Sequence, residues 1–501
     1  MLTSVEAGVS VDFGTGHLIK KTGSICPVCL EPLQARVCER ENQVWMDKEC
    51  RIHGRFSALL SSDSRHYYRS AEEPMSGGAC CSAGGCGPAS ANASLSETTP
   101  WVNHSCTVLI EIIERCNLSC PTCFAGSSPQ LSGLMSLSEF RRQVDRLAEG
   151  GKRGSDMIQL SGGEPTLHPE LFSMVRFLFR RGFNHVCINS NGIKLAQPEF
   201  VARLAACTQE FPGGKLFIYL QFDGFEEETQ LELRGRSDLL DVKRKALENC
   251  HNAGISVHPV MTLTRGINDH EVGDFVRLAV ESPWLKNVVI QPAMYSGRYE
   301  NPRRVDRLTL ADAVQAVCEQ FGVFSPEDFM PIPCSDPNCF GMAMALRSGT
   351  GLVPISRYFP AYDSWSGEQE RKLIDKITDT INGPAAIREA VRWISSEQNA
   401  AALFSQLDEA EIDALLDALD GLGPGGLGDP AVGESLWENL LTISIKPFMD
   451  AFTYDQDRVD RCCVHILDRN GQPVSFCEFN AIQRVRQTVA PTGAIGITVT
   501  T

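Results

Sequence analysis

The stretch ERCNLSCPTCFAG, residues 114–126, decides the fold because it places Cys116, Cys120 and Cys123 in a C-x3-C-x2-C spacing after a strand-like run. Three thiolates from one loop can hold three irons of a [4Fe-4S] cluster and leave the fourth iron without a protein ligand. An open coordination site is a reactive one, as at other catalytic metals. For this spacing alone, the alternative is a structural metal site or three core cysteines.

The chain beyond this loop alternates strand-like and helix-like segments. Two amphipathic stretches, 169–182 and 242–254, are typical of helices and end at glycine. The strand-like segments are rich in β-branched and aromatic residues and lie at 107–113, 157–161, 185–190, 215–222, 255–263 and 287–294. Six strand–helix units predict an α/β fold with a parallel sheet, curved into a partial or complete (βα)6 barrel of the TIM type.

Two polar segments follow the second and third of these strands, SGGEP at 161–165 and NSNG at 189–192. Together with the cysteine loop, they resemble the motifs of the radical S-adenosylmethionine (SAM) superfamily. Two glycines would let the main chain approach the ligand, and a carboxylate would neutralise the SAM ammonium. The resemblance implies that both segments bind SAM, through Gly162, Gly163, Glu164, Ser190 and Asn191.

The resemblance also implies a radical mechanism that begins with reductive cleavage of SAM. SAM occupies the open iron, one electron from an external donor of the flavodoxin or ferredoxin type enters its sulfonium, and methionine leaves. The 5′-deoxyadenosyl radical then abstracts hydrogen from an unactivated alkyl carbon. The cofactors carry this step, while the barrel excludes water and aims the radical. One departure is Thr122, where many members have an aromatic residue; here the aromatic residue is Phe124.

An N-terminal module, residues 1–70, carries a second metal-binding pattern. CPVC supplies Cys26 and Cys29, and CRIHG supplies Cys50 and His53. A C-x2-C pair followed by C-x2-H predicts a tetrahedral mononuclear site for zinc or a rubredoxin-like iron. Cys38 is the alternative to His53 as the fourth ligand.

The remaining clustered cysteines predict auxiliary iron–sulfur clusters. A loop and a hairpin with an Asn470-Gly471 turn can each supply half of one site. The ligands expected in the C-terminal region are Cys334, Cys339, Cys463 and Cys477, with Cys463 preferred over its neighbour Cys462. The ligands expected for a second auxiliary cluster, in and beside the Gly/Ser-rich segment 71–106, are Cys80, Cys81, Cys86 and Cys106. A flexible loop with exposed thiols is the alternative there.

These modules, with LQFDG at 220–224, resemble the branch of the superfamily that contains the archaeal tetraether lipid synthase and proteins described as pterin methyltransferases. The resemblance implies carbon–carbon coupling of lipid hydrocarbon chains, for which we expect an apolar tunnel to the barrel mouth. One alternative is the methylation or maturation of a pterin or peptide. Another is an electron carrier or metal-binding scaffold without catalysis.

Composition limits the partners and the location. A net charge of −16 argues against a nucleic-acid partner, because phosphate binding requires clustered Lys and Arg. No secretory signal and no apolar run of about 18 residues is visible, so we expect a cytoplasmic protein with reduced cysteines. The lipid hypothesis adds peripheral membrane contact. The expected radical SAM core is 107–325, followed by a C-terminal region, 326–501, with a helical insert at 366–425.

Overall fold

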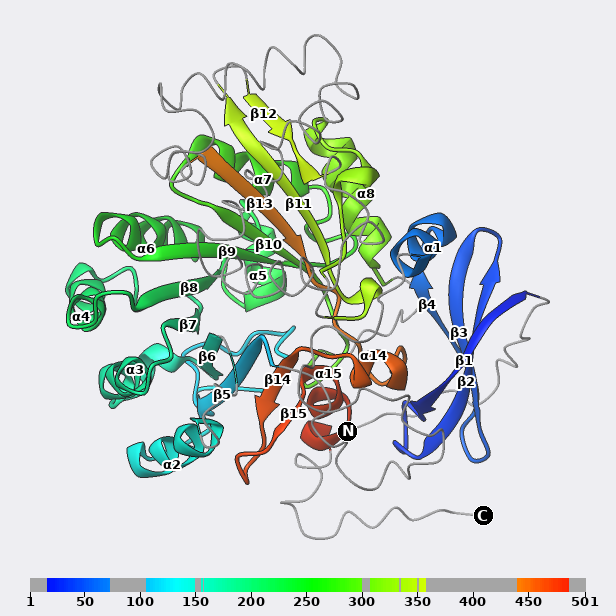
Figure 1. The fold of residues 1–501 in the computed structure, drawn as a ribbon, viewed down its shortest axis with the longest axis horizontal. Coiled ribbons are helices and arrows are strands. Elements are labelled where there is room, and N and C mark those ends of the chain that lie inside the picture. Colours follow the sequence, from blue (N-terminus) through cyan, green and yellow to red (C-terminus); the bar gives the residue numbers. More distant parts are fainter. Residues whose placement is uncertain are drawn as a thin grey trace, which may run out of the picture.

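The computed structural model describes residues 16–72, 105–148, 155, 157–299, 307–332, 335–348, 351–356 and 439–485. Two sheets organise these residues, a four-stranded N-terminal sheet and an 11-stranded sheet (Figure 1). The insert expected at 366–425 and the cysteines Cys80, Cys81, Cys86 and Cys334 lie outside the described residues. No helix in the described part of the chain has the length and apolar character needed to cross a membrane.

Six parallel strands form the centre of the large sheet and follow one another in chain order. Most of their residues are buried, as expected for parallel strands covered on both faces. They are β5 (Thr107–Ile113), β6 (Met157–Gly162), β7 (His185–Ser190), β8 (Lys215–Gln221), β9 (Ser256–Leu263) and β10 (Asn287–Pro292). The α/β class and the six strands expected from the sequence are therefore confirmed.

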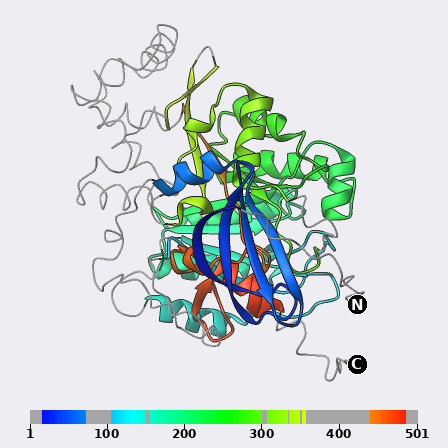
Figure 2. The ribbon, with the colours of Figure 1, turned by 90° about the vertical axis from the view of Figure 1, so that its right-hand side faces the viewer.

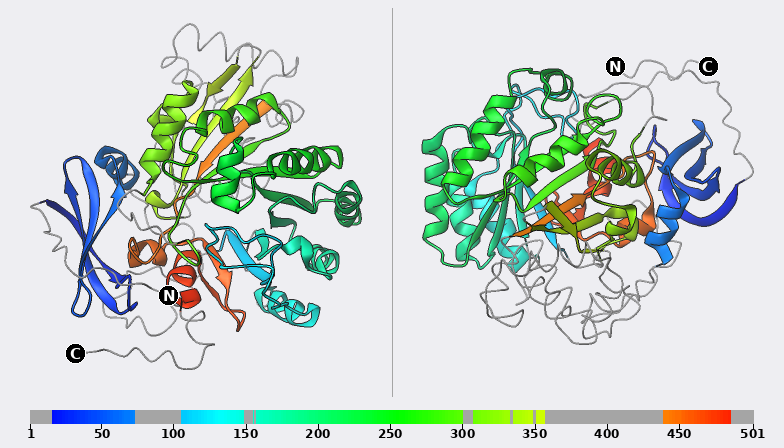
Figure 3. Two further views of the ribbon diagram at one scale, coloured as in Figure 1. Left: turned by 180° about the vertical axis from the view of Figure 1, so that it is seen from behind. Right: turned by 90° about the horizontal axis from the view of Figure 1, so that it is seen from above.

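Helices connect these strands and cover the outer side of the sheet (Figures 1 and 3). Their apolar faces pack on the strands in one continuous core that includes Phe140, Met174 and Phe275. The helices are α2 (Leu137–Ala148), α3 (Leu171–Arg180), α4 (Pro198–Gln209), α5 (Glu227–Arg234), α6 (Leu240–Asn252), α7 (Val272–Glu281) and α8 (Leu310–Phe321). Short helical turns are η1 (Pro165–Leu167), η2 (Pro326–Asp328) and η3 (Pro337–Cys339).

C-terminal segments extend the large sheet at both ends. β13 (Leu440–Ile445) lies parallel to β10 and antiparallel to β11 (Gly341–Ser348), which pairs with β12 (Gly351–Pro354). At the opposite end, β14 (Val464–Leu467) lies parallel to β5 and pairs with β15 (Pro473–Ser475). The β14–β15 pair is the expected hairpin. The helices α14 (Gln456–Asp460), α15 (Phe476–Glu478) and η6 (Phe479–Gln483) flank it.

The N-terminal module is an antiparallel meander followed by a helix. It comprises β1 (His17–Ile25), β2 (Pro32–Arg40), β3 (Gln43–Cys50), β4 (Gly54–Ser61) and α1 (Ser64–Glu72). Figure 2 shows this sheet in front of the C-terminal elements. Polar contacts join the two parts, since Thr22 Oγ1 donates to Asp455 at 2.7 Å and Ser24 Oγ donates to the Tyr454 carbonyl at 2.6 Å.

Candidate active site and metal centres

A cavity of about 210 Å³ lies at the carboxyl ends of the central strands. The loop after β5 contributes Cys116, Cys120 and Cys123 to its lining. The ends of β6 and β7 contribute every residue that the sequence assigned to SAM, namely Gly162, Gly163, Glu164, Ser190 and Asn191. Ligand sites in parallel α/β folds lie at this edge of the sheet, so the placement agrees with the expected active site.

Gly162 and Gly163 are required by contacts within the protein. A Cβ atom on Gly162 would lie 2.1 Å from the Ile113 carbonyl oxygen, and one on Gly163 would lie 2.2 Å from that of Arg115. The Gly163 N–H donates to the Ile113 carbonyl at 2.6 Å, and the Glu164 N–H donates to the Arg115 carbonyl at 3.0 Å. The glycines therefore hold the end of β6 against the cysteine loop, which the sequence analysis attributed to ligand approach alone.

The Glu164 carboxylate joins the SGGEP and NSNG segments. Its Oε1 accepts hydrogen bonds from the Thr166 hydroxyl at 2.6 Å and the Ser190 hydroxyl at 3.0 Å, and its Oε2 accepts one from the Asn191 N–H at 2.8 Å. Burial raises the pKa of Glu164, and these donors oppose the shift. With a single bond at Oε2, that oxygen retains capacity for the ammonium group expected from the resemblance.

Asn191 reaches the cysteine loop as well. Its Nδ2 donates to Asn117 Oδ1 at 2.7 Å and lies 3.8 Å from Cys116 Sγ. The Leu118 N–H points at the same sulfur, at 3.4 Å. Burial raises the pKa of the Cys116 thiol to about 12. A metal centre would supply the positive charge that this desolvated sulfur needs as a thiolate, so the donor set fits a cluster with one open iron.

An ion-pair network supports the part of the cavity wall that contains Arg234. The Arg234 Nε donates to Asp223 Oδ2 at 2.7 Å, and Lys243 Nζ donates to the same oxygen at 3.2 Å. Burial opposes ionisation of Asp223, yet these two cations hold its pKa well below the usual range. Arg234 also lines the cavity, whereas Arg236 is exposed and pairs with Asp238.

The inner wall of the cavity is polar where β8, β9 and β10 end. Gln221 Nε2 donates to Thr262 Oγ1 at 3.0 Å and to Asp223 Oδ1 at 2.7 Å. Lys446 follows β13, and its Nζ lies 3.4 Å from the Tyr219 hydroxyl. Within the described ranges, no carboxylate pairs with Lys446, and the Gln291 carboxamide has no hydrogen-bond partner. Another part of the cavity lining is apolar and contains Leu109, Met294, Phe448 and Phe476.

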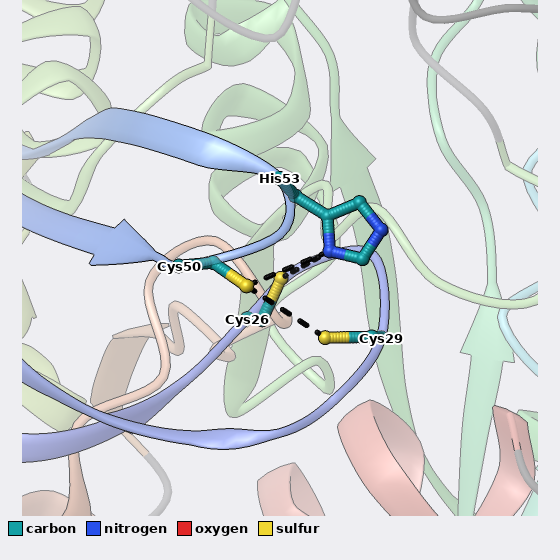
Figure 4. A group of neighbouring side chains, drawn as sticks. All are labelled: Cys26, Cys29, Cys50 and His53. Carbon is teal, nitrogen blue, oxygen red and sulfur yellow. Dashed lines mark hydrogen bonds between the residues drawn. The ribbon is translucent and has the colours of Figure 1, made fainter. Parts of the chain in front are cut away.

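The N-terminal module brings Cys26, Cys29, Cys50 and His53 together (Figure 4). Cys29 Sγ lies 3.9 Å from Cys50 Sγ, and His53 Nδ1 lies 3.6 Å from Cys26 Sγ and 3.5 Å from Cys50 Sγ. A tetrahedral zinc with Zn–S bonds of about 2.3 Å needs ligand atoms separated by about 3.8 Å. The spacing therefore fits one mononuclear ion.

Electrostatics favour a thiolate at this site. Burial opposes it, but hydrogen bonds from the backbone of Ile52 and His53 and from the His53 side chain lower the pKa of Cys50 to about 6. Cys38 lies in β2 opposite Trp45 and is absent from the group of four. The group of four side chains therefore contains His53 and not Cys38.

Three C-terminal cysteines lie near one another in the folded chain. Burial raises the pKa of Cys339 to about 12 and that of Cys462 to about 11, and the thiols of Cys339, Cys462 and Cys477 interact electrostatically. Cys477 follows Phe476 of the cavity wall, and its sulfur accepts from the Met449 N–H at 3.3 Å. Three desolvated thiols at one place fit the donor set of an auxiliary cluster.

The two adjacent cysteines, of which Cys463 was preferred from the sequence, lie in different surroundings. Cys463 packs in an apolar cluster with Cys106, Ile332 and Phe340, and its carbonyl accepts from the Thr107 N–H at 3.2 Å. Cys462 is the member of the pair that interacts with Cys477.

Several residues of the site escaped the sequence analysis. Gln291 lies in the predicted strand β10 but was not singled out, whereas Lys446 follows β13 and Arg458 lies on α14, in segments whose positions are set only by the folded C-terminal region. A detectable signal existed for Arg234, because it lies one helical turn after Gln230 on α5, and both side chains are buried.

Comparisons with known proteins identify two domains in the chain. Residues 110–279 match the radical SAM superfamily, and residues 18–62 match the HMPTM N-terminal zinc ribbon domain. A 7,8-dihydro-6-hydroxymethylpterin dimethyltransferase of Methanocaldococcus jannaschii is 28% identical, covering 93% of this chain and 94% of its own. A GTP 3′,8-cyclase of Desulforamulus reducens is also 28% identical, over 35% of this chain and 51% of its own.

Among solved structures, Streptococcus suis SuiB bound to S-adenosylmethionine aligns with a TM-score of 0.33 and 16% identity, over 43% of this chain and 46% of that chain. The matched core, the cysteine loop and the four-ligand ribbon point to one assignment. The chain contains a radical SAM domain and an N-terminal zinc ribbon, which support an iron–sulfur enzyme, and its relatives include a pterin dimethyltransferase.

Proposed function

We propose that this enzyme functionalises a C–H bond of a polar, planar heterocycle of the pterin class. When bound, a [4Fe-4S] cluster with one open iron supplies the electron that converts SAM into methionine and a hydrogen-abstracting 5′-deoxyadenosyl radical. Cys116, Cys120 and Cys123 would hold the cluster. Glu164 and Asn191 would orient SAM beside it, and a flavodoxin or ferredoxin would donate the electron.

The observation that carries the substrate class is the unsatisfied polar wall of the cavity. The Lys446 ammonium and the Gln291 carboxamide follow paired strands β13 and β10 and face the same space. An alkyl chain bound there would leave the Gln291 carboxamide without a partner and the Lys446 ammonium with the Tyr219 hydroxyl as its hydrogen-bond partner, at a cost of about 1–3 kcal/mol for the neutral group and more for the charge. The edge of a pterin ring offers the acceptors and donors that both groups lack.

A second candidate is the carbon–carbon coupling of lipid chains. The apolar wall of Leu109, Met294, Phe448 and Phe476 favours it, because that wall suits an alkyl chain. The same wall also suits the flat face of a heterocycle, whereas the polar wall suits only the heterocycle. We therefore prefer the pterin class, for which methylation is the reaction named for the relative with the widest coverage.

Two further centres complete the proposal. Zinc is the ion proposed for Cys26, Cys29, Cys50 and His53, because three sulfurs and one nitrogen at tetrahedral spacing are a common structural zinc set. An auxiliary iron–sulfur cluster is proposed at Cys339, Cys462 and Cys477, in place of the set that included Cys463. Cys334 as its fourth ligand and a further cluster at Cys80, Cys81, Cys86 and Cys106 remain sequence predictions, since most of these residues lie outside the described ranges.

Deuterium transfer tests the substrate class directly. The reconstituted enzyme is given SAM, dithionite and either deuterated 7,8-dihydro-6-hydroxymethylpterin or a deuterated dialkyl ether lipid in micelles. We expect deuterium in 5′-deoxyadenosine with the pterin only. Deuterium from the lipid would support the second candidate, and deuterium from neither would reject both substrates.

Two variants test the polar wall. Lys446→Met should raise the KM for the pterin at least tenfold, because it removes from the cavity a cation that has no carboxylate partner among the described residues. Arg236→Met is the matched control, since Arg236 is exposed and pairs with Asp238. An unchanged KM in Lys446→Met would contradict the proposed binding mode.

A further inference from the structure

We propose that Arg458 sets the reduction potential of the auxiliary cluster at Cys339, Cys462 and Cys477. The inference rests on the auxiliary cluster proposed above and adds a residue that is not a ligand. Arg458 lies on α14 (Gln456–Asp460), two residues before the end of that helix and just ahead of Cys462.

The guanidinium contacts the cluster-binding loop at two points. Arg458 Nε donates to Cys339 Sγ at 3.3 Å, and Arg458 Nη2 donates to the Asn338 carbonyl at 3.2 Å. The Asp336 carboxylate fixes this loop, because it accepts from the Asn338 N–H at 3.0 Å. The position of the Arg458 guanidinium is therefore fixed by its two hydrogen bonds to the η3 loop, and the Asp336 carboxylate holds that loop in place.

The surroundings make this charge effective. Burial raises the pKa values of Cys339 and Cys462, so water screens this region poorly. Arg458 interacts electrostatically with Cys477 as well as Cys339. One guanidinium thus acts on thiols from both halves of the site, the η3 loop and the C-terminal hairpin.

A cation beside ligand sulfurs stabilises the state with the extra electron. Cluster potentials depend on net charge, on hydrogen bonds to sulfur and on exposure, and Arg458 contributes to the first two. Reduction adds one electron to the cluster, and the electron comes from dithionite in the experiment below. Arg458 should therefore raise the potential and favour a cluster that accepts electrons.

Arg461 provides a matched control from the same segment. It carries the same charge three residues later, but more than half of its side chain is exposed, and it pairs with Asp336 Oδ2 at 3.5 Å. Solvent screening weakens the effect of such a charge. A comparison of the Arg458 and Arg461 variants therefore distinguishes the effect of a contact with the cluster ligands from the effect of a general change in charge.

The test is an EPR-monitored redox titration of the full chain with Cys116, Cys120 and Cys123 changed to Ala, which removes the catalytic cluster. The auxiliary signal is the one lost in Cys477→Ser. Arg458→Met should lower its one-electron reduction constant at least tenfold, equal to 59 mV. Arg458→Lys should lower it less, and Arg461→Met should leave it unchanged.

The inference is overturned by an unchanged potential in Arg458→Met, by an equal shift in Arg461→Met, or by the absence of any signal that depends on Cys477. If Arg458→Met loses its iron, Arg458→Gln is titrated instead, because it removes the charge and keeps a hydrogen-bond donor. SAM cleavage by the wild-type chain is a separate measurement, so failure here and failure of the proposed function are distinguishable.

Discussion

The Glu164 carboxylate shows how a single residue organises the candidate SAM site. Its two oxygens accept from two backbone N–H groups, Thr166 N–H at 3.2 Å on Oε1 and Asn191 N–H at 2.8 Å on Oε2. A buried carboxylate with donors on both oxygens is fixed in orientation. The motif residue therefore holds two loops at a set distance before any ligand binds.

Glu164→Gln should disrupt this arrangement. In either orientation the amide must present its NH2 group to a backbone N–H, so one donor loses its acceptor at a cost of about 1–3 kcal/mol. We expect a lower melting temperature and a SAM Kd raised at least tenfold, measured by thermal unfolding and equilibrium binding. Glu170→Gln is the control, because Glu170 makes no side-chain cap bond at α3. Equal behaviour of the two variants would contradict this role.

At the scale of elements, strands β1 and β3 fasten the N-terminal module to the segment before α14. Lys48 Nζ of β3 donates to the Ala451 carbonyl at 2.7 Å and to Ser24 Oγ at 3.0 Å. Lys20 Nζ of β1 lies 2.8 Å from Asp455 Oδ2. Both lysines belong to one interface, but Lys20 pairs with a carboxylate, whereas Lys48 donates to neutral oxygens.

Lys48 should make the stability of this interface depend on pH. Burial lowers the pKa of Lys48 to about 7, against about 10.4 in the unfolded chain. Between these values the unfolded state binds more protons, so the free energy of unfolding rises with pH. From pH 7 to 9.5 the wild type should gain about 3 kcal/mol relative to Lys48→Met.

Melting temperatures of both proteins across this pH range measure the difference. Lys20→Met is the control, because its carboxylate partners raise the pKa of Lys20 despite burial, and its charge is kept throughout the window. A difference between wild type and Lys48→Met that stays constant or falls with pH would show that Lys48 is not neutral in the folded protein.

Sequence was sufficient for elements whose signals are local. The ranges of β5–β10 follow from runs of β-branched residues, and the cysteine loop and SGGEP follow from spacing. Cys462 and Cys463 could not be separated in this way, because their different neighbours come from segments distant in the sequence. The place of Lys446 in the cavity could not be predicted from the sequence either, because β13, which precedes it, pairs with β10 only in the folded sheet.

At the scale of the whole molecule, the zinc ribbon and the auxiliary cysteines are linked through one segment. The ribbon contacts Ala451, Tyr454 and Asp455, and the chain then forms α14 and reaches Cys462. Loss of the ribbon metal would therefore release a segment that carries both Arg458 and an auxiliary ligand. We therefore expect the mononuclear centre to support the assembly of the proposed auxiliary cluster.

Removal of the ribbon metal should be detected at both centres. Cys50→Ser with His53→Ala should lose one equivalent of zinc and part of the auxiliary iron, measured by elemental analysis after reconstitution. Cys38→Ser is the control and should retain the zinc, because Cys38 lies outside the four-ligand group. Full zinc in the double variant would contradict the assigned ligands, and full auxiliary iron without zinc would contradict the structural link.

The central claim concerns the cysteine loop and is tested by SAM cleavage. The chain, reconstituted without oxygen, is incubated with SAM and dithionite, and 5′-deoxyadenosine is quantified by mass spectrometry. We predict that the wild type forms 5′-deoxyadenosine and that the variant with Cys116, Cys120 and Cys123 changed to Ala forms none. Product in the variant, or no product in an iron-loaded wild type, would contradict the assignment of this loop as the catalytic cluster site.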